Sequence, residues 1–199
     1  KELFSSKYVK WLLLALISWI FGYWTNYAWL DMGPTLALAA KVPLNLVLLS
    51  ELWWAFPIGS LLWIYLAERI DRKYSPIGWV SANMLSLLGV VIGAYIKSAW
   101  PVIALVIISD LFLFSSEGSY YIYTSELFPS RARATAMSFV DGLGHIGAAL
   151  SPIAMGIAWA SVGPVPALWV GILPGIVTLI LLPVFGPRTK GRALTEISR

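Results

Sequence analysis

Four of the ionisable residues inside the apolar stretches of this chain mark a candidate site, because charge is costly in hydrocarbon. Asp110 and Glu117 are seven residues apart, and Asp141 and His145 are four apart. In a helix, each spacing brings the two side chains to one face. A carboxylate and an imidazole in a partly dry cavity take up and release protons near neutral pH. We predict that Glu117 carries a proton, and the other coupling candidates are Asp110, Asp141 and His145. The alternative is a hydrogen-bonded pair that only stabilises the helices.

Aromatic and amide side chains occupy the middle of the first apolar stretch. The candidates for lining a substrate cavity there are Tyr23, Trp24, Asn26 and Tyr27. Aromatic faces stack on sugars and aromatic solutes, and an amide both donates and accepts hydrogen bonds. These residue types predict a cavity for a small organic solute. The alternative is that half of them face lipid.

Six apolar stretches must position these residues. Each is long enough to cross about 30 Å of hydrocarbon as a helix that rises about 1.5 Å per residue. They cover residues 11–31, 44–67, 77–96, 102–124, 134–159 and 166–185. The connections are too short for a soluble domain, and no stretch alternates like a barrel strand. The sequence therefore predicts an all-α membrane protein in which residues 1–199 form one bundle of six transmembrane helices.

The basic residues predict how this bundle is oriented. Twelve of the 14 Lys and Arg residues fall on one side of the six spans, and only Lys41 and Lys97 fall on the other. Lys and Arg concentrate in cytoplasmic loops. We therefore expect both termini in the cytoplasm and the protein in the cell membrane.

Composition excludes other classes of protein. With 59% hydrophobic residues, 12% charged residues and a mean hydropathy of +0.78, the chain suits lipid better than water. Its basic residues form short caps beside apolar segments and not a continuous stripe, so we expect no nucleic-acid partner. The absence of cysteine and the single histidine exclude disulfides and cysteine or multi-histidine metal sites, and we expect no metal and no cofactor. The chain begins with Lys1 and not Met, which favours a piece of a longer protein.

Two charged connections on the predicted cytoplasmic side carry distinctive patterns. The charged residues of the first include Glu68, Arg69 and Arg72. In the second, Glu126 ends one helix, Pro129 stops it and Arg133 begins the next, so we expect an acid and an arginine to meet at the membrane surface. Solvated loop charge is the alternative for each connection taken alone.

Together with the tail, these connections resemble three motifs of the major facilitator superfamily, and within it of the sugar-porter-like branch. After its tenth helix, that branch has an acid, an aliphatic residue, an aromatic residue, proline, three variable positions and arginine. The matching residues are Glu126, Leu127, Phe128, Pro129 and Arg133. The signature after its twelfth helix is similar to residues 187–197, although Arg188 stands where an acid is usual. The loop between its eighth and ninth helices is similar to residues 66–73, with Glu68 in place of an aspartate.

The resemblance implies the C-terminal half of a twelve-helix transporter, built as two inverted three-helix repeats. Its partner is then an N-terminal six-helix half of the same longer chain, or a second copy, with the solute held between the halves and moved by alternating access. Acid and arginine pairs in such proteins hold the cytoplasmic gate shut. The residues to which the resemblance gives this gate role are Glu68, Arg69, Arg72, Glu126 and Arg133.

The resemblance leaves the solute open. The seventh helix of sugar porters carries paired glutamines followed by glycine and asparagine, and only Asn26 and its aromatic neighbours are comparable here. The tenth helix lacks the glycine-proline-tryptophan run, and residues 115–121 are closer to relatives that move organic ions or aromatic acids. We therefore expect a sugar or an organic or aromatic acid as the solute, transported with a proton.

Two other classes stay open. An intramembrane serine protease would use Ser119 as nucleophile and His145 as base, but Gly118 and Ser119 are a weak signal without a fuller motif. A six-helix protein that dimerises into a transporter, or a scaffold that transports nothing, is the other. We expect a transporter and not an enzyme.

Overall fold

The computed structural model describes residues 2–6, 8–43, 55–67 and 69–191, and the regular structure of these residues is helical. A short turn, η1 (Glu2–Phe4), precedes α1 (Val9–Tyr27), which continues into the π-helix η2 (Ala28–Met32) and then α2 (Gly33–Ala39). The middle of the chain forms α4 (Ala55–Ala67), η4 (Arg72–Tyr74), α5 (Ser75–Ile96), α6 (Trp100–Asp110) and α7 (Leu113–Glu126). The last elements are α8 (Ser130–Val162), α9 (Pro164–Ile172) and α10 (Gly175–Phe185).

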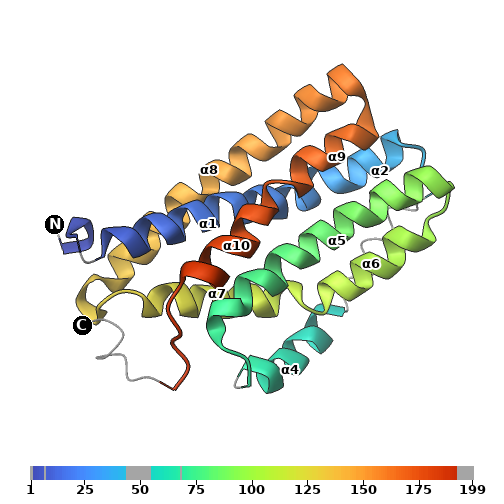
Figure 1. Ribbon diagram of the computed structural model, residues 1–199. Helices are drawn as coiled ribbons and strands as arrows, with labels where there is room; N and C mark the ends of the chain where they lie inside the picture. Colours follow the sequence, from blue (N-terminus) through green and yellow to red (C-terminus); the bar gives the residue numbers. More distant parts are fainter. Residues whose placement is uncertain (1, 7, 44–54, 68, 192–199) are drawn as a thin grey trace.

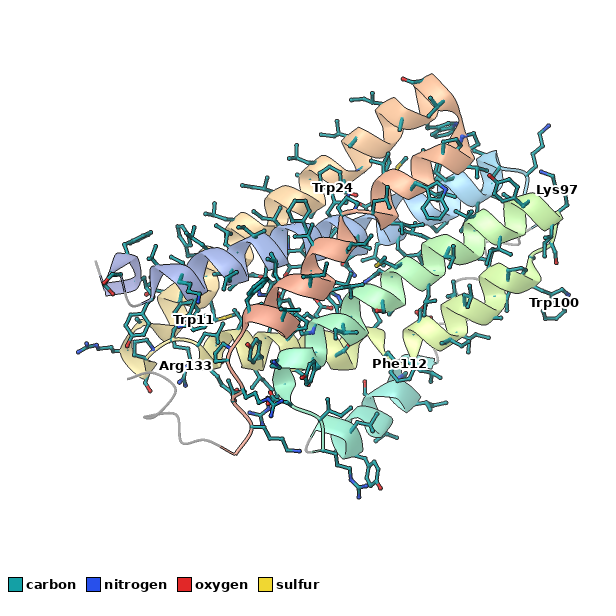
Figure 2. The ribbon with its side chains drawn as sticks, in the orientation of Figure 1. Trp11, Trp24, Lys97, Trp100, Phe112 and Arg133 are labelled. Atoms are coloured by element: carbon teal, nitrogen blue, oxygen red, sulfur yellow. The ribbon has the colours of Figure 1, made fainter. Side chains whose placement is uncertain are left out.

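The long helices lie lengthwise in one bundle, so the turns gather at its two ends (Figure 1). Helix α1 packs on α8 and α10, and α5 packs on α6, α7, α9 and α10. One end carries η4, the α7–α8 turn and the segment after α10. We call it the basic end, and its cations include Arg69, Arg72, Lys73, Arg131, Arg133, Arg188 and Lys190. Lys97 and Trp100 lie at the opposite end from Arg133 (Figure 2).

Three helical stretches of the described chain are long and apolar enough to cross a membrane. They are Arg72–Ile96, Ser130–Val162 and Pro164–Phe185. Exposed apolar side chains recur every three or four residues along α8, at Leu143, Ile146, Leu150, Ile153 and Ile157. A surface of this kind suits lipid or another membrane helix and not water.

Two pairs of consecutive helices, α6 with α7 and α9 with α10, each follow one helical path that is interrupted near its middle. Between α9 and α10 the interruption falls at Pro174, whose missing N–H ends the regular hydrogen bonding. Between α6 and α7 it falls at residues 111–112, where Gly59 of α4 packs so closely that a Cβ would collide with the Leu111 carbonyl. Pro152 lies inside α8 without ending it. Proline therefore accounts for one of the two interruptions, and packing accompanies the other.

Large aromatic side chains fill the core between α1, α5, α7 and the α7–α8 turn. The largest fully buried ones are Trp19, Trp79, Tyr120, Tyr123 and Phe128. Trp19 stacks on Tyr120 with ring centroids 4.3 Å apart and donates its indole N–H to the Thr124 hydroxyl at 3.0 Å. These contacts hold α7 against α1 and so position the polar side chains that both helices carry.

Candidate functional site

Asp141 of α8 is the centre of a polar cluster between three helices. Its carboxylate oxygen Oδ1 accepts a hydrogen bond from the Tyr23 hydroxyl of α1 at 2.5 Å and another from the Tyr121 hydroxyl of α7 at 2.6 Å. The two hydroxyls also contact each other. Hydrogen bonds to an ionised acceptor are stronger than those between neutral groups. The carboxylate therefore ties α1 and α7 to α8.

His145 lies one helical turn after Asp141. Its Nδ1 is 2.8 Å from the Asp141 backbone carbonyl oxygen and 4.0 Å from the carboxylate. Because a carbonyl oxygen only accepts, a hydrogen bond at this distance requires Nδ1 to be the donor. The His145 side chain is 44% exposed. The ring is therefore only partly covered by the other helices of this chain.

Glu117 lies one turn before Tyr121 on α7, near enough to Asp141 and His145 for their charges to interact. The structure thus brings three of the four predicted coupling residues together. Asp110 is separate, because it ends α6 before the interruption at residues 111–112 and is only 5% exposed. Within the described part of the chain, no hydrogen bond or ion pair joins it to the cluster. We predicted that Asp110 and Glu117 share one helical face. That prediction requires α6 and α7 to be one continuous helix, which they are not.

Two of the four predicted cavity residues belong to this cluster. Tyr23 holds Asp141 and packs on the His145 ring with centroids 4.1 Å apart. Tyr27 lies edge-on to the same ring at 6.1 Å. Tyr121, which sequence reasoning did not single out, completes the cluster. The sequence does carry a signal for it. Tyr121 lies four residues after Glu117, and this spacing puts both side chains on the same face of a helix.

The other two predicted cavity residues serve contacts between helices. Trp24 donates its indole N–H to the Val170 carbonyl oxygen of α9 at 2.8 Å. Asn26, which is 5% exposed, donates from its side-chain amide to the Asn83 side chain of α5 at 3.3 Å. A helix buried on several sides offers partners to polar residues in every direction, and the sequence alone does not say which direction faces a solute.

A pocket of 410 Å³ opens between α7 and α8 beside the cluster. It is lined by Tyr121, Ile122, Ser125, Met137, Ser138 and Asp141. Hydroxyls and one carboxylate supply hydrogen-bonding groups, while Ile122 and Met137 supply apolar wall. A mixed lining of this kind suits a small polar organic molecule. Ser125 lines the pocket and precedes Glu126 in α7, so one edge of the pocket lies next to the basic end.

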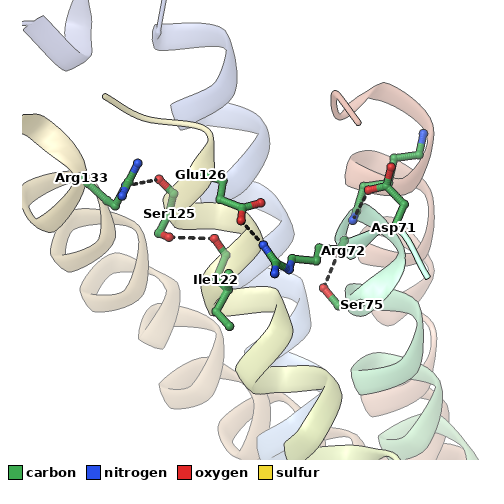
Figure 3. A network of polar contacts seen from close by, with 8 residues as sticks. Asp71, Arg72, Ser75, Ile122, Ser125, Glu126 and Arg133 are labelled. Carbon is green, nitrogen blue, oxygen red and sulfur yellow. Dashed lines mark hydrogen bonds and ion pairs between the residues drawn. The ribbon is translucent and has the colours of Figure 1, made fainter. Parts of the chain in front are cut away.

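At the basic end, Glu126 pairs with Arg72 of η4 (Figure 3). Arg133 instead donates from Nε to the Ser125 carbonyl at 3.0 Å and from Nη2 to the Phe128 carbonyl at 3.5 Å. An acid and an arginine do meet here, but the arginine comes from the other charged connection. The last carbonyls of α7 carry partial negative charge, and they attract Arg133 from the first turn of α8.

The segment after α10 binds the same end of the bundle. The Tyr123 hydroxyl donates to the Pro187 carbonyl at 3.1 Å, and Lys190 Nζ donates to the Arg69 carbonyl at 2.6 Å. The Arg69 guanidinium lies over the Tyr65 ring, 3.9 Å from its centroid. The tail and both charged connections are therefore in contact. Glu68, the remaining predicted gate residue, lies outside the described residues.

The helical fold, the polar cluster at Asp141 and the contacts among the three motifs agree with one family. A family model described as "Sugar (and other) transporter" matches residues 2–199. The chain belongs to this family. It is therefore an integral membrane chain of the major facilitator superfamily, a superfamily of transporters and not of enzymes. This membership sets aside the serine protease built on Ser119 and His145.

Three curated relatives share 23–29% identity with the chain. A "Putative inorganic phosphate transporter" of Schizosaccharomyces pombe is 29% identical over 145 residues, which are 68% of this chain and 24% of the relative. The "Putative metabolite transport protein YaaU" of Escherichia coli is 23% identical over 205 residues, which are 100% of this chain and 45% of the relative. "Solute carrier family 22 member 7" of Bos taurus is 26% identical over 199 residues, which are 98% of this chain and 34% of the relative.

The chain thus spans less than half the length of these relatives. No solved structure matches it.

Proposed function

We propose that this chain is the C-terminal half of a secondary transporter that moves a small organic solute by alternating access, coupled to a proton. The observation that carries the proposal is the cluster at Asp141, where carboxylate, imidazole and phenol groups from α1, α7 and α8 meet beside a pocket. Groups that exchange protons are thereby placed next to the space that a solute can enter.

Glu117 is the proposed proton carrier. Asp141 already accepts hydrogen bonds from two tyrosine hydroxyls, whereas Glu117 lies one turn from Tyr121 on α7, near enough to Asp141 and His145 for their charges to interact. Protonation of Glu117 then removes one negative charge from beside Asp141 and His145. The change in charge favours one arrangement of the helices over another, which is what coupling requires. Asp110 is kept as a separate, buried candidate.

The proposed solute site combines the pocket with the exposed face of the cluster. Tyr23 and Tyr27 offer aromatic faces, and Ser125 and Ser138 offer hydroxyls. Such a surface suits a sugar or an organic or aromatic acid that presents hydrogen-bond donors. The remaining surface is proposed to come from an N-terminal six-helix half of the same longer chain, or from a second copy of this chain.

The proposed membrane arrangement has six spans in two inverted three-helix repeats, with the basic end and both termini in the cytoplasm of the cell membrane. Arg69, Arg72, Glu126 and Arg133, together with Glu68, are proposed as gate residues that change partners as the halves rock. The Arg72–Glu126 pair supports this role because it joins the two charged connections.

Uptake by the full protein in proteoliposomes tests the coupling. The probes are radiolabelled glucose, benzoate and inorganic phosphate, each with and without an inward proton gradient. We expect Glu117→Gln to keep uptake of the accepted probe down its own gradient but to lose acceleration by the proton gradient. Asp31→Asn, which changes an exposed acid outside the cluster, is the matched control and should keep that acceleration. Acceleration that persists in Glu117→Gln would contradict the assignment.

A further inference from the structure

Pro174 leaves a carbonyl group without its usual partner in the last helical path. In an α-helix, the N–H of each residue donates to the carbonyl four residues before it, but proline has no N–H. The carbonyl affected by Pro174 is that of Val170. The N–H groups of Ile176 and Val177 then bond only three residues back, at 3.2 and 3.1 Å, so the helix is interrupted between α9 and α10.

Trp24 supplies the missing donor from another helix. Its indole N–H donates to the Val170 carbonyl oxygen at 2.8 Å, which is a normal hydrogen-bond length. An unpaired carbonyl in a place that water does not reach is unfavourable, and the indole N–H gives this one a partner. We propose that Trp24 is a positioning residue that acts as the substitute donor for Pro174 and holds the interrupted helix to α1.

Helix α1 holds α9–α10 on both sides of the interruption. Beyond Trp24 and Val170 on the α9 side, the Thr178 hydroxyl of α10 donates to the Ser18 carbonyl of α1 at 2.7 Å. Between these two bonds, Gly175 packs so closely that a Cβ would lie 2.8 Å from the Thr25 hydroxyl. The interruption is therefore bridged by α1, and the two parts of the path can bend without losing their attachment.

The pairing also reaches the polar cluster. Tyr23, which holds Asp141, is the neighbour of Trp24 in α1. One turn of α1 therefore bonds to α8 on one side and to α9 on the other. A shift of α1 that accompanies a change at Asp141 is passed to the last helical path through Trp24. This role in movement rests on the proposed transport function, whereas the exchange of hydrogen-bond donors does not.

Restoring the backbone donor should make the indole dispensable. The full protein is compared as Trp24→Phe, Pro174→Ala and the double variant, each with Ser138→Cys in a background without other cysteines. The sequence has no cysteine of its own, so a maleimide reports the pocket alone. Loss of the indole donor should change the labelling rate by about threefold to tenfold and lower the apparent melting temperature.

The double variant decides the proposal. Because the Pro174→Ala substitution restores a backbone N–H that can bond to the Val170 carbonyl, we expect both the labelling rate and the melting temperature to return toward their starting values. Trp169→Phe, which shortens a 40% exposed indole on α9, should change neither. If Trp24→Phe has no effect, or if Pro174→Ala does not correct it, the pairing is wrong. Should Trp24→Phe fail to reach the membrane, recovery of membrane protein in the double variant supports the pairing and continued failure overturns it.

Neither readout needs a solute, so the outcome is independent of the uptake experiment. Rescue of the melting temperature without any change in labelling would leave Trp24 a structural residue and contradict its role in movement.

Discussion

At the scale of single residues, the charged groups of this chain work through partners supplied by other helices. Asp141 accepts hydroxyls from α1 and α7, and Glu126 pairs with Arg72 of η4. Each carboxylate therefore links two or more elements. Because such a contact depends on both partners, experiments should change the two residues of a pair together as well as singly.

The Arg72–Glu126 pair can be tested by exchange of charge. Arg72→Glu and Glu126→Arg should each reduce uptake of the accepted probe severely, because each puts like charges together at the basic end. The Glu126 side chain is only 11% exposed, so each single variant should also lose some stability, and its amount in the membrane is measured beside its uptake. The variant with both changes should recover part of the uptake. If it transports no better than the single variants, the pair is not a unit of the gate.

Arg133→Lys distinguishes the other arginine. Arg133 binds carbonyl groups at the end of α7, so a lysine that keeps the charge but loses the planar donors should weaken uptake without being corrected by any change at Glu126. If a substitution at Glu126 did recover uptake in Arg133→Lys, Arg133 and Glu126 would pair directly, and the assignment of Arg133 to the carbonyl groups would be wrong.

The spacing of residues in the sequence accounts for part of this site. Helical periodicity puts Asp141 and His145 on one face, and the structure has them one turn apart. It does not reveal Trp24 as a helix contact, because the choice between a solute and a neighbouring helix depends on long-range packing. It misses the Arg72–Glu126 pair for the same reason, since 54 residues separate the partners.

At the scale of elements, close packing of α1 on α8 holds the cluster together. A Cβ at Gly147 of α8 would collide with the Ile20 carbonyl of α1, and one at Gly144 would lie 3.1 Å from the Trp19 side chain. Small residues allow membrane helices to approach in this way. The sequence also has a stripe of small residues every four positions on α8, formed by Gly144, Ala148, Gly156 and Ala160 with Pro152 between them, but a Cβ at Gly156 would meet nothing within 4 Å. Only the part of the stripe that faces α1 is used for packing.

Gly147→Ala should therefore destabilise the protein where Gly142→Ala does not. The new methyl group at position 147 meets backbone, which cannot turn aside, and overpacking of this kind costs about 1–3 kcal/mol. A Cβ at Gly142 meets nothing within 4 Å, so alanine there should be neutral or slightly stabilising. Thermal unfolding of the two variants in the same detergent makes the comparison. Equal melting temperatures would show that α1 and α8 are not tightly packed at Gly147.

Helix interruptions follow the sequence only in part. Pro174 marks one of them, as its missing N–H requires. The interruption at residues 111–112 has neither proline nor glycine, and it lies where α4 packs through Gly59 on the Leu111 backbone. Tertiary contact decides that position, so the separation of Asp110 from Glu117 could not be read from their spacing.

At the scale of the whole molecule, one part of the bundle has a buried core, whereas the polar cluster in another part is only partly covered by this chain. Aromatic side chains close the core around Trp19 and Trp79, whereas His145 and the pocket beside Asp141 remain exposed. In alternating access, a solute site opens to one side of the membrane at a time, so protein must surround the solute. We propose that a partner surface covers this open side, either another half of the same polypeptide or a second copy of this chain.

The mass of the native subunit separates these two partners. The relatives are more than twice as long as the matched region, so we expect a subunit of at least about twice 21.9 kDa that is functional as a monomer, with six helices contributed by each half. Native mass spectrometry of the protein purified from its own membrane gives both the subunit mass and the stoichiometry. A 21.9 kDa subunit found in pairs would contradict the single-chain arrangement. It would place two Asp141 clusters across one cavity, and Glu117→Gln in one copy of a linked dimer would then leave the second carrier in place.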